Sequence, residues 1–423
     1  MNRRGLVPAD RAQRIIAAAT FVNMLGSGVF MAAASLFFTQ SVGLSLAQVG
    51  TGLGIATLTG LLAGVPVGRL ADRLDPREVY LGTLAVQGAA MTALVFVHSF
   101  WLFVLVVSLT ELAGSAAAAS RAPLVRGYSG AEPTRFRSYL RSVANLGGAG
   151  GALAAGFAIQ LGTRDAYLAL VLGNAVSFLA CAVIILRLPS LPPLPVPPQA
   201  GRWQALKDRP YLAVAVLDGL IGIQGHVLVF ALPLWIVLHS DAPRWFVGVS
   251  VLVNTGMVVL LQVRASRGVD SPAAAGRAVR RSGLAFLAGM GLIAVTGGLP
   301  GWLAIVVITL GICVHTTGEL WHAAGSLELR FRLAPAYAQG QYAGVYGLGL
   351  RLGGAAAPAT VGLLCVSWGA PGWLALGGLF AVAGYAMPLV IRWAENGQRT
   401  GSGRCPEQAR HRVLTRQAAP ALS

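Results

Sequence analysis

The side chains of this sequence that could do chemistry stand inside long apolar runs, where ionisable groups are costly in lipid and mark ion or substrate pathways. Glu111 lies about 10 residues into its run, roughly 15 Å along a helix and near the middle of a membrane. A carboxylate in such low-dielectric surroundings has a raised pKa and can exchange protons near neutral pH. Glu111 is therefore the first candidate for a proton carrier, and Glu319 is the second.

Two histidines accompany Glu319 in its run. His315, Glu319 and His322 follow one another at steps of 4 and 3 residues, which places them on one face of a helix. Histidine and glutamate are metal-ligand types, but no further His, Cys or Asp cluster completes a shell, so no metal site is predicted. A proton relay or substrate contact, and polar packing between helices, both remain open for these residues.

The other candidates for a proton or substrate cavity are single polar groups in their runs. His226 suits a packed cavity wall as well as a proton carrier. Asn23 occupies a position similar to that of Asp218 in the second half of the chain, where a hydrogen bond at mid-membrane and helix packing are both open. Arg351 can pair with one of the glutamates when that glutamate is deprotonated, which would lower its pKa.

The elements that position these residues are predicted from composition. Of 423 residues, 55% are hydrophobic and 11% are charged, whereas a soluble domain carries about 25% charged residues. The solvent for most of the chain must therefore be lipid, and a spanning helix needs roughly 20 apolar residues. The apolar runs predict twelve transmembrane helices in an all-α membrane protein, at 14–38, 48–68, 79–98, 101–121, 138–161, 166–187, 211–238, 246–263, 282–298, 301–323, 341–366 and 372–392.

The basic residues predict the orientation of these helices. If both termini lie inside, 29 Arg and Lys residues fall in the tails and inside loops, and only Arg164 and Arg244 fall outside. Positive loops lie on the cytoplasmic side, so this bias favours cytoplasmic N- and C-termini and an even number of helices. The basic residues that produce the net charge of +17 are scattered between apolar runs and form no basic domain. Nucleic acid is therefore not an expected partner.

The chain divides at a proline-rich stretch. We expect an N-tail over 1–13, a six-helix bundle over 14–187, a linker over 188–210, a second six-helix bundle over 211–393 and a disordered tail over 394–423. Short matches between the halves suggest a duplicated unit, with Val49-Gly50 matching Val247-Gly248 and Glu111-Leu112 matching Glu319-Leu320. Duplication is common in transporters, so the two bundles should be pseudo-symmetric.

The loop after the second run carries a motif. It reads Gly68-Arg69-Leu70-Ala71-Asp72-Arg73-Leu74-Asp75-Pro76-Arg77. This resembles the signature loop of the major facilitator superfamily, Gly-x-Leu-Ala-Asp-Arg-x-Gly-Arg-Arg/Lys, except at Asp75 and Pro76. The resemblance covers about residues 10 to 393 and implies a twelve-helix transporter in which helices 1, 4, 7 and 10 line the cavity.

The resemblance implies a conformational latch formed by Gly68, Leu70, Asp72, Arg73 and Arg77. Gly68 lets its helix approach a neighbour closely. Asp72 can sit at the positive N-terminal end of the helix that starts near Gly340. Arg73 and Arg77 can bridge to other inside loops, and such contacts would hold the cytoplasmic side shut in one state and release it in the other.

Two departures concern drug–proton antiporters of that superfamily. Thr110 stands where they carry an Arg in helix 4, and helix 5 lacks the Pro of their Gly-Pro-x-x-Gly-Gly motif in Gly151-Ala152-Leu153-Ala154-Ala155-Gly156. Proton coupling should therefore use the carboxylates instead.

The expected function is secondary active transport by alternating access, with proton-coupled export of a small hydrophobic or amphipathic compound. Uptake of a metabolite by the same fold, and a membrane sensor without transport, are the alternatives. No nucleophile, metal or cofactor constellation predicts an enzyme, and no phosphate-binding loop suggests ATP as energy source. The expected partners are a small-molecule substrate, protons and the lipid bilayer of the bacterial cytoplasmic membrane, and the expected state is a monomer.

Overall fold

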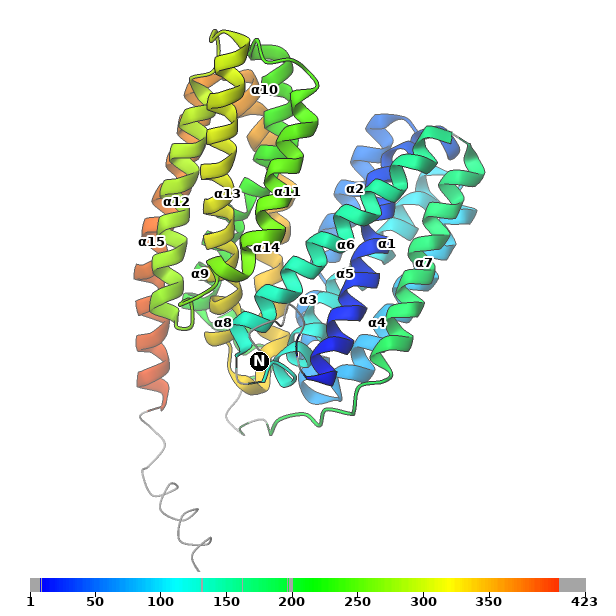
Figure 1. Cartoon of the computed structure of the whole chain (residues 1–423). Coiled ribbons are helices and arrows are strands. Elements are labelled where there is room, and N and C mark those ends of the chain that lie inside the picture. Colours follow the sequence, from blue (N-terminus) through cyan, green and yellow to red (C-terminus); the bar gives the residue numbers. More distant parts are fainter. Residues whose placement is uncertain are drawn as a thin grey trace, which may run out of the picture.

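The computed structural model describes residues 8, 10–130, 132–161, 163–195, 197 and 201–402, and every regular element within them is a helix. The helices form two bundles that lie side by side (Figure 1). Buried apolar side chains gather into two clusters, one drawn from residues 16–188 and the other from residues 205–394 together with Val65. Each half of the chain therefore has its own core.

The first bundle holds the helices before the proline-rich stretch. They are α1 (Arg11–Leu36) with the π-helical turn η1 (Phe37–Ser41), α2 (Leu46–Gly60), α3 (Gly64–Arg73), α4 (Pro76–Ala93) with η2 (Leu94–Phe96), α5 (Phe100–Gly127), α6 (Pro133–Leu161) and α7 (Arg164–Ile185).

The second bundle follows the short linker helix α8 (Gln204–Lys207). Its helices are α9 (Arg209–Gly222), η3 (Ile223–His226), η4 (Val227–Ala231) and α10 (Leu232–His239), then α11 (Phe246–Ala265), α12 (Pro272–Ala294), α13 (Gly301–Arg332), η5 (Ala336–Ala338), α14 (Gln339–Val361) with η6 (Gly362–Ser367), and α15 (Ala370–Ser402).

The lengths and apolar surfaces of the described helices are typical of membrane-spanning helices. Ten helical stretches are long and apolar enough to cross it. The remaining long helices, α6 and α12, each carry three arginines within their first ten residues. Many large apolar side chains are exposed, among them Met31 at 78% and Leu260 and Trp101 at 75%, as expected where lipid replaces water. The chain is a multi-pass membrane protein, and the count of twelve spans stays a prediction.

Several element boundaries differ from the predicted runs. The run 48–68 is split between α2 and α3, and the run 211–238 changes from α-helix to 3₁₀- and π-helical turns at residues 223–231. The tail predicted to be disordered from 394 is corrected, because α15 continues to Ser402 and Ala394 packs into the core of the second bundle. The rest of that predicted tail, 403–423, and most of the predicted N-tail lie outside the described residues.

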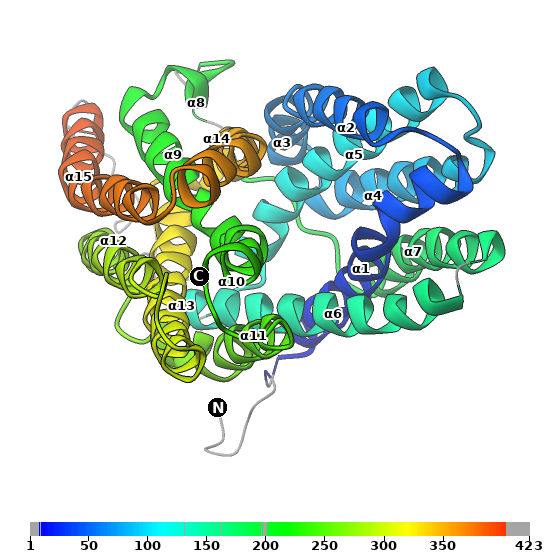
Figure 2. The same cartoon turned by 90° about the horizontal axis from the view of Figure 1, so that it is seen from above.

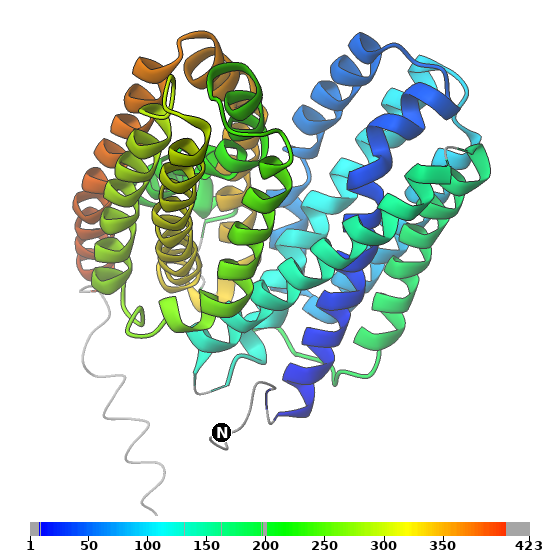
Figure 3. The same ribbon diagram turned by 45° about the horizontal axis from the view of Figure 1, so that its top comes forward.

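The two bundles approach each other at one end of their long axes and are apart at the other. We call the first of these ends the terminal side, because α1 begins there and α15 ends there; the bundles converge toward it and diverge toward the opposite side (Figures 1 and 3). Seen from above, α6 runs beside α11 and α13, and α14 runs beside α3 and α5 (Figure 2). These two helix groups carry the contacts between the halves.

Candidate functional site

The Asp72 carboxylate lies at the N-terminus of α14. Its Oδ1 accepts a hydrogen bond from the backbone N–H of Gly340 at 2.7 Å, and its Oδ2 accepts one from Gln341 at 2.8 Å. The first N–H groups of a helix have no partner within the helix and carry its positive dipole end, so a carboxylate is favoured there. Asp72 belongs to α3 of the first bundle, so this contact joins the two halves at the place that the sequence analysis expected.

Glycines allow the two helices to come this close. A Cβ atom on Gly68 would stand 2.0 Å from the carbonyl oxygen of Gly340, and a Cβ on Gly340 would stand 2.1 Å from that of Gly68. The same arrangement recurs one turn along, where a Cβ on Gly344 would meet backbone atoms of Gly64 at 2.5 Å. Helices α3 and α14 therefore pack backbone to backbone, which no larger residue permits.

Among the other motif residues, Arg69 lies over the ring of Trp203, 5.4 Å from its centroid, and Arg73 is exposed. Asp75 caps α4, because its Oδ1 accepts from the N–H of Arg77 at 2.8 Å, and Pro76 fits the first helical position, which needs no N–H donor. This accounts for the departure from the signature at both residues. Arg77 donates to the carbonyl of Leu186 at the end of α7 at 2.8 Å, and Leu70 is 46% exposed.

Glu111 and Arg351 form an ion pair between the bundles. The carboxylate comes from α5 and the guanidinium from α14, and both side chains are partly exposed. Gly60, at the end of α2, borders the pair, since a Cβ there would stand 3.1 Å from Arg351 Nη1. The candidate proton carrier of the first half is thus paired with Arg351, which the sequence places near the middle of an apolar run.

Glu319 also pairs with an arginine of the other half. Arg141 of α6 approaches Glu319 Oε1 at 3.3 Å and donates from Nε to Gln262 Oε1 at 3.2 Å. Asn254 of α11 donates to Glu319 Oε2 at 3.1 Å. The carboxylate of α13 is therefore held between α6 and α11, and it does not hydrogen-bond with the histidines that flank it in sequence.

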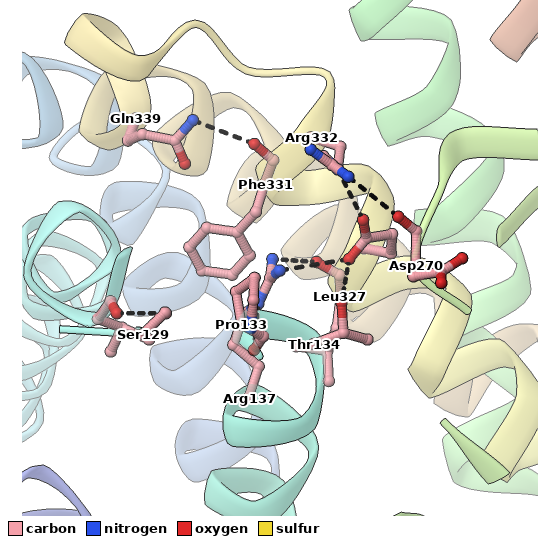
Figure 4. A network of polar contacts seen from close by, with 11 residues as sticks. Ser129, Pro133, Thr134, Arg137, Asp270, Leu327, Phe331, Arg332 and Gln339 are labelled. Carbon is pink, nitrogen blue, oxygen red and sulfur yellow. Dashed lines mark hydrogen bonds and ion pairs between the residues drawn. The ribbon is translucent and has the colours of Figure 1, made fainter. Parts of the chain in front are cut away.

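A third ion pair lies nearer the terminal side. Glu328 of α13 accepts from Arg137 of α6 at 3.2 Å, from Thr134 at 2.6 Å, and from Arg332 at 3.0 Å (Figure 4). Glu328 and Arg137 are 1% and 5% exposed, and Arg137 lies over the ring of Phe331, 4.4 Å from its centroid. Sequence reasoning missed this cluster, although the Glu328–Arg332 spacing of one helical turn was a signal for it.

Asp218 belongs to a buried network inside the second bundle. Its Oδ1 lies 3.0 Å from His322 Nε2, and its Oδ2 accepts from the hydroxyl of Ser326 at 3.0 Å. Ser326 Oγ in turn lies 3.1 Å from the hydroxyl of Tyr346 on α14. Asp218 is 0% exposed, so the residue predicted for a cavity is enclosed among α9, α13 and α14 in this conformation.

The remaining candidates are not brought together with these pairs. His315 is fully buried against the ring of Phe286 on α12, at 4.8 Å between centroids, and neither ring nitrogen has a hydrogen-bond partner. His226 lies at the interruption of the seventh predicted run, partly buried, with Nδ1 unpaired. Asn23 is partly buried in α1. Within the described residues no group of three His, Cys, Asp or Glu is placed to hold a metal ion.

The linker is attached near the latch at both ends. Leu191 N–H donates to Asp75 Oδ2 at 3.2 Å. At the other end, Gln341 Nε2 donates to the carbonyl of Arg202 at 2.9 Å, and Gln341 Oε1 accepts from the N–H of Ala205 at 3.2 Å. Gln341 thus contributes its backbone to the Asp72 contact and its side chain to the linker.

Comparison with known proteins identifies the family to which the sequence is similar. Residues 16–358 match the model of the Major Facilitator Superfamily. The multidrug resistance protein MdtH of Aeromonas hydrophila subsp. hydrophila is 26% identical over 354 residues, covering 82% of this chain and 86% of the relative. MdtH of Klebsiella pneumoniae is 24% identical over 393 residues, covering 90% of this chain and 93% of the relative.

Solved structures share the fold at low sequence identity. A bacterial homologue of the iron transporter ferroportin in an outward-facing state has a TM-score of 0.74 and 16% identity, covering 92% of this chain and 100% of that chain. The transporter FucP in the outward conformation has a TM-score of 0.67 and 13% identity, covering 90% of this chain and 98% of that chain. At these identities the likeness concerns the arrangement of the helices alone.

Proposed function

The chain belongs to the major facilitator superfamily, and from this premise we propose that it exports small hydrophobic or amphipathic compounds in exchange for protons. The chain is a membrane transporter by family. Export is supported by the relatives, which carry the name of multidrug resistance proteins. Proton coupling is supported by the ion pair between Glu111 and Arg351, which is the observation that carries this part of the proposal.

We propose further that twelve helices cross the membrane with both termini in the cytoplasm, and that the chain acts as a monomer in the bacterial cytoplasmic membrane. The terminal side is then the cytoplasmic side. The contacts of Asp72, Glu328 and Glu319 with the opposite bundle lie toward that side, so the conformation described here is closed to the cytoplasm. Alternating access requires these contacts to form in one state and break in the other.

Protonation of Glu111 can drive the conformational cycle of the transporter. An ionised Glu111 attracts the positively charged Arg351 of the other bundle, whereas a protonated Glu111 loses the charge–charge attraction and leaves only a weaker hydrogen bond from the guanidinium. A ligand shifts a conformational equilibrium by its difference in affinity for the two states. A proton that binds more tightly when the bundles have parted therefore favours opening of the terminal side, and release of the proton favours closure.

The test is gradient-driven transport by Glu111→Gln in membrane vesicles. Glutamine mimics the protonated carboxyl at nearly constant size, so we expect binding of an exported dye to persist while its pH-gradient-driven movement is lost. Glu78→Gln is the matched control, because Glu78 is 62% exposed on α4 and pairs only with the neighbouring Arg77. Full gradient-driven transport in both Glu111→Gln and Glu319→Gln would contradict coupling through these carboxylates.

A further inference from the structure

Arg141 occupies a site that is built by the other bundle. Two acceptor oxygens receive its guanidinium, Gln262 Oε1 from Nε at 3.2 Å and Glu319 Oε1 from Nη2 at 3.3 Å. The second oxygen of Glu319 is fixed by Asn254 Nδ2 at 3.1 Å, and the same Asn254 nitrogen also reaches Thr316 Oγ1 at 3.0 Å. The Glu319 carboxylate is therefore held in place by Asn254 as well as by the arginine.

The receiving groups all belong to the second bundle. Gln262 and Asn254 lie on α11, and Thr316 and Glu319 lie on α13. Gln262 is 0% exposed, and its Nε2 has no hydrogen-bond partner. Arg141 alone comes from the first bundle, on α6. When the bundles part on the terminal side, Arg141 withdraws with α6 and the acceptors stay behind together.

Withdrawal of Arg141 leaves the Glu319 carboxylate without its cation. A partly buried charge that loses its partner favours any replacement that restores charge and hydrogen bonds. A guanidinium offers several N–H donors in one plane, which is why it binds a carboxylate and a neighbouring acceptor together. The side chains of Arg141 and Glu319 are 35% and 19% exposed, so the site is not sealed by surrounding protein.

We propose that this site binds the cationic head of the exported compound, and that the guanidinium of Arg141 occupies the same site when the compound is not bound. The compound is an organic cation with at least two N–H donors, such as a guanidinium or amidinium attached to an apolar group. Arg141 fills the site while the terminal side is closed, and the compound fills it after the bundles have parted. This inference rests on the proposed export function and names the class of its substrate.

The experiment measures equilibrium binding of benzylguanidinium to the purified full-length chain in lipid nanodiscs, without a gradient. Arg141→Gln removes the tethered competitor, so we expect its affinity to rise about tenfold, as the site becomes free in a larger fraction of molecules. Glu319→Gln should abolish binding. Arg135→Gln is the control on the same helix, since Arg135 is 44% exposed and pairs with Glu132 of its own bundle, and its affinity should not change.

Two further probes separate charge from hydrogen bonding. Benzylurea keeps the N–H donors without the charge, and benzyltrimethylammonium keeps the charge without the donors. Both should bind roughly tenfold more weakly than benzylguanidinium, since charge-assisted hydrogen bonds need both properties. Equal binding of either probe would overturn the proposed ligand class. If Glu319→Gln does not fold, Gln262→Met tests the site, because it removes one acceptor and should weaken benzylguanidinium.

The outcomes distinguish this site from the export function. Unchanged or weaker binding in Arg141→Gln, or full binding in Glu319→Gln, would overturn the site even if the chain exports cations. Binding as expected together with no export of any cation from vesicles would overturn the function and leave the site standing.

Discussion

The contact between Asp72 and the N-terminus of α14 yields a prediction with a magnitude. Its two hydrogen bonds, at 2.7 and 2.8 Å, join a carboxylate to backbone N–H groups and exist only while the bundles touch. Hydrogen bonds to a charged group contribute about 1.5 kcal/mol or more each, so Asp72→Ala should destabilise the closed terminal side by about 3 kcal/mol. That is roughly a hundredfold in the ratio of closed to open molecules, at tenfold per 1.4 kcal/mol.

The assay is the distance distribution between two spin labels on the terminal side. Cysteines at Glu132 and Asp270, both exposed and on opposite bundles, carry the labels in a chain whose native cysteines are replaced by serine. We expect a single short distance for the parent chain and a substantial longer component for Asp72→Ala. Asp72→Asn keeps one neutral acceptor and should fall between the two.

Asp75→Ala is the matched control for this prediction. Asp75 lies three residues further on and also accepts from two backbone N–H groups, those of Arg77 and Leu191, but neither belongs to a helix of the second bundle. Its loss should leave the distances unchanged. The reasoning is refuted if Asp72→Ala keeps the parent distribution, or if Asp75→Ala opens the terminal side to the same extent.

The remaining predictions use the same chain. Gly340→Ala places a Cβ 2.1 Å from the carbonyl oxygen of Gly68, far inside van der Waals contact, so transport should be lost at normal expression. Gly347→Ala on the same helix, where a Cβ would meet nothing within 4 Å, should leave transport normal. Glu328→Gln should lengthen the label distances, because breaking a buried ion pair costs about 3–5 kcal/mol; an unaltered distribution would contradict a closing role for the pair. A reporter fused after Ser423 should be active in the cytoplasm, and Thr163→Cys should react with an impermeant reagent from outside; the reverse pattern would overturn the proposed topology.

Local signals in the sequence were sufficient to predict the contact of Asp72 with the start of α14. Gly68 and Asp72 stand four residues apart in a recognisable loop, and the start of the partner helix near Gly340 could be placed because an apolar run begins there. The family followed from the resemblance of this loop to a known signature, and the multi-pass character followed from composition. These features depend on residues close together in the chain or on averages over it, which a single sequence contains.

The ion pairs between the bundles could not be foreseen in full. Arg137 and Glu328 were placed outside the predicted spans, because one span began at 138 and the other ended at 323. In the structure, α6 already begins at Pro133 and α13 continues to Arg332. Charged residues extend a helix beyond its apolar stretch without a hydropathy signal. Which glutamate meets which arginine depends on the packing of two separately folded halves, and no local pattern encodes that packing.

His315 and Asp218 illustrate a second limit. The spacing of His315, Glu319 and His322 was right for neighbouring positions on one helix, but only Glu319 pairs with the opposite bundle, whereas His315 packs on Phe286 and His322 contacts Asp218, both in their own bundle. A helix in a bundle has neighbours on several sides. Two residues that differ by a modest angle around the helix axis can therefore face the opposite bundle and the core of their own bundle. Periodicity gives relative angles and leaves the absolute rotation of the helix open.

The attachment of the linker has a mechanical consequence. Leu191 is anchored at Asp75 and Arg202 at Gln341, and both anchors flank the same contact between α3 and α14. The 11 residue steps between Leu191 and Arg202 could reach about 36 Å if extended, well beyond the few ångströms that separate the partners of that contact. The connection therefore remains when the contact between α3 and α14 breaks, and its length sets an upper limit on how far Leu191 and Arg202 can separate.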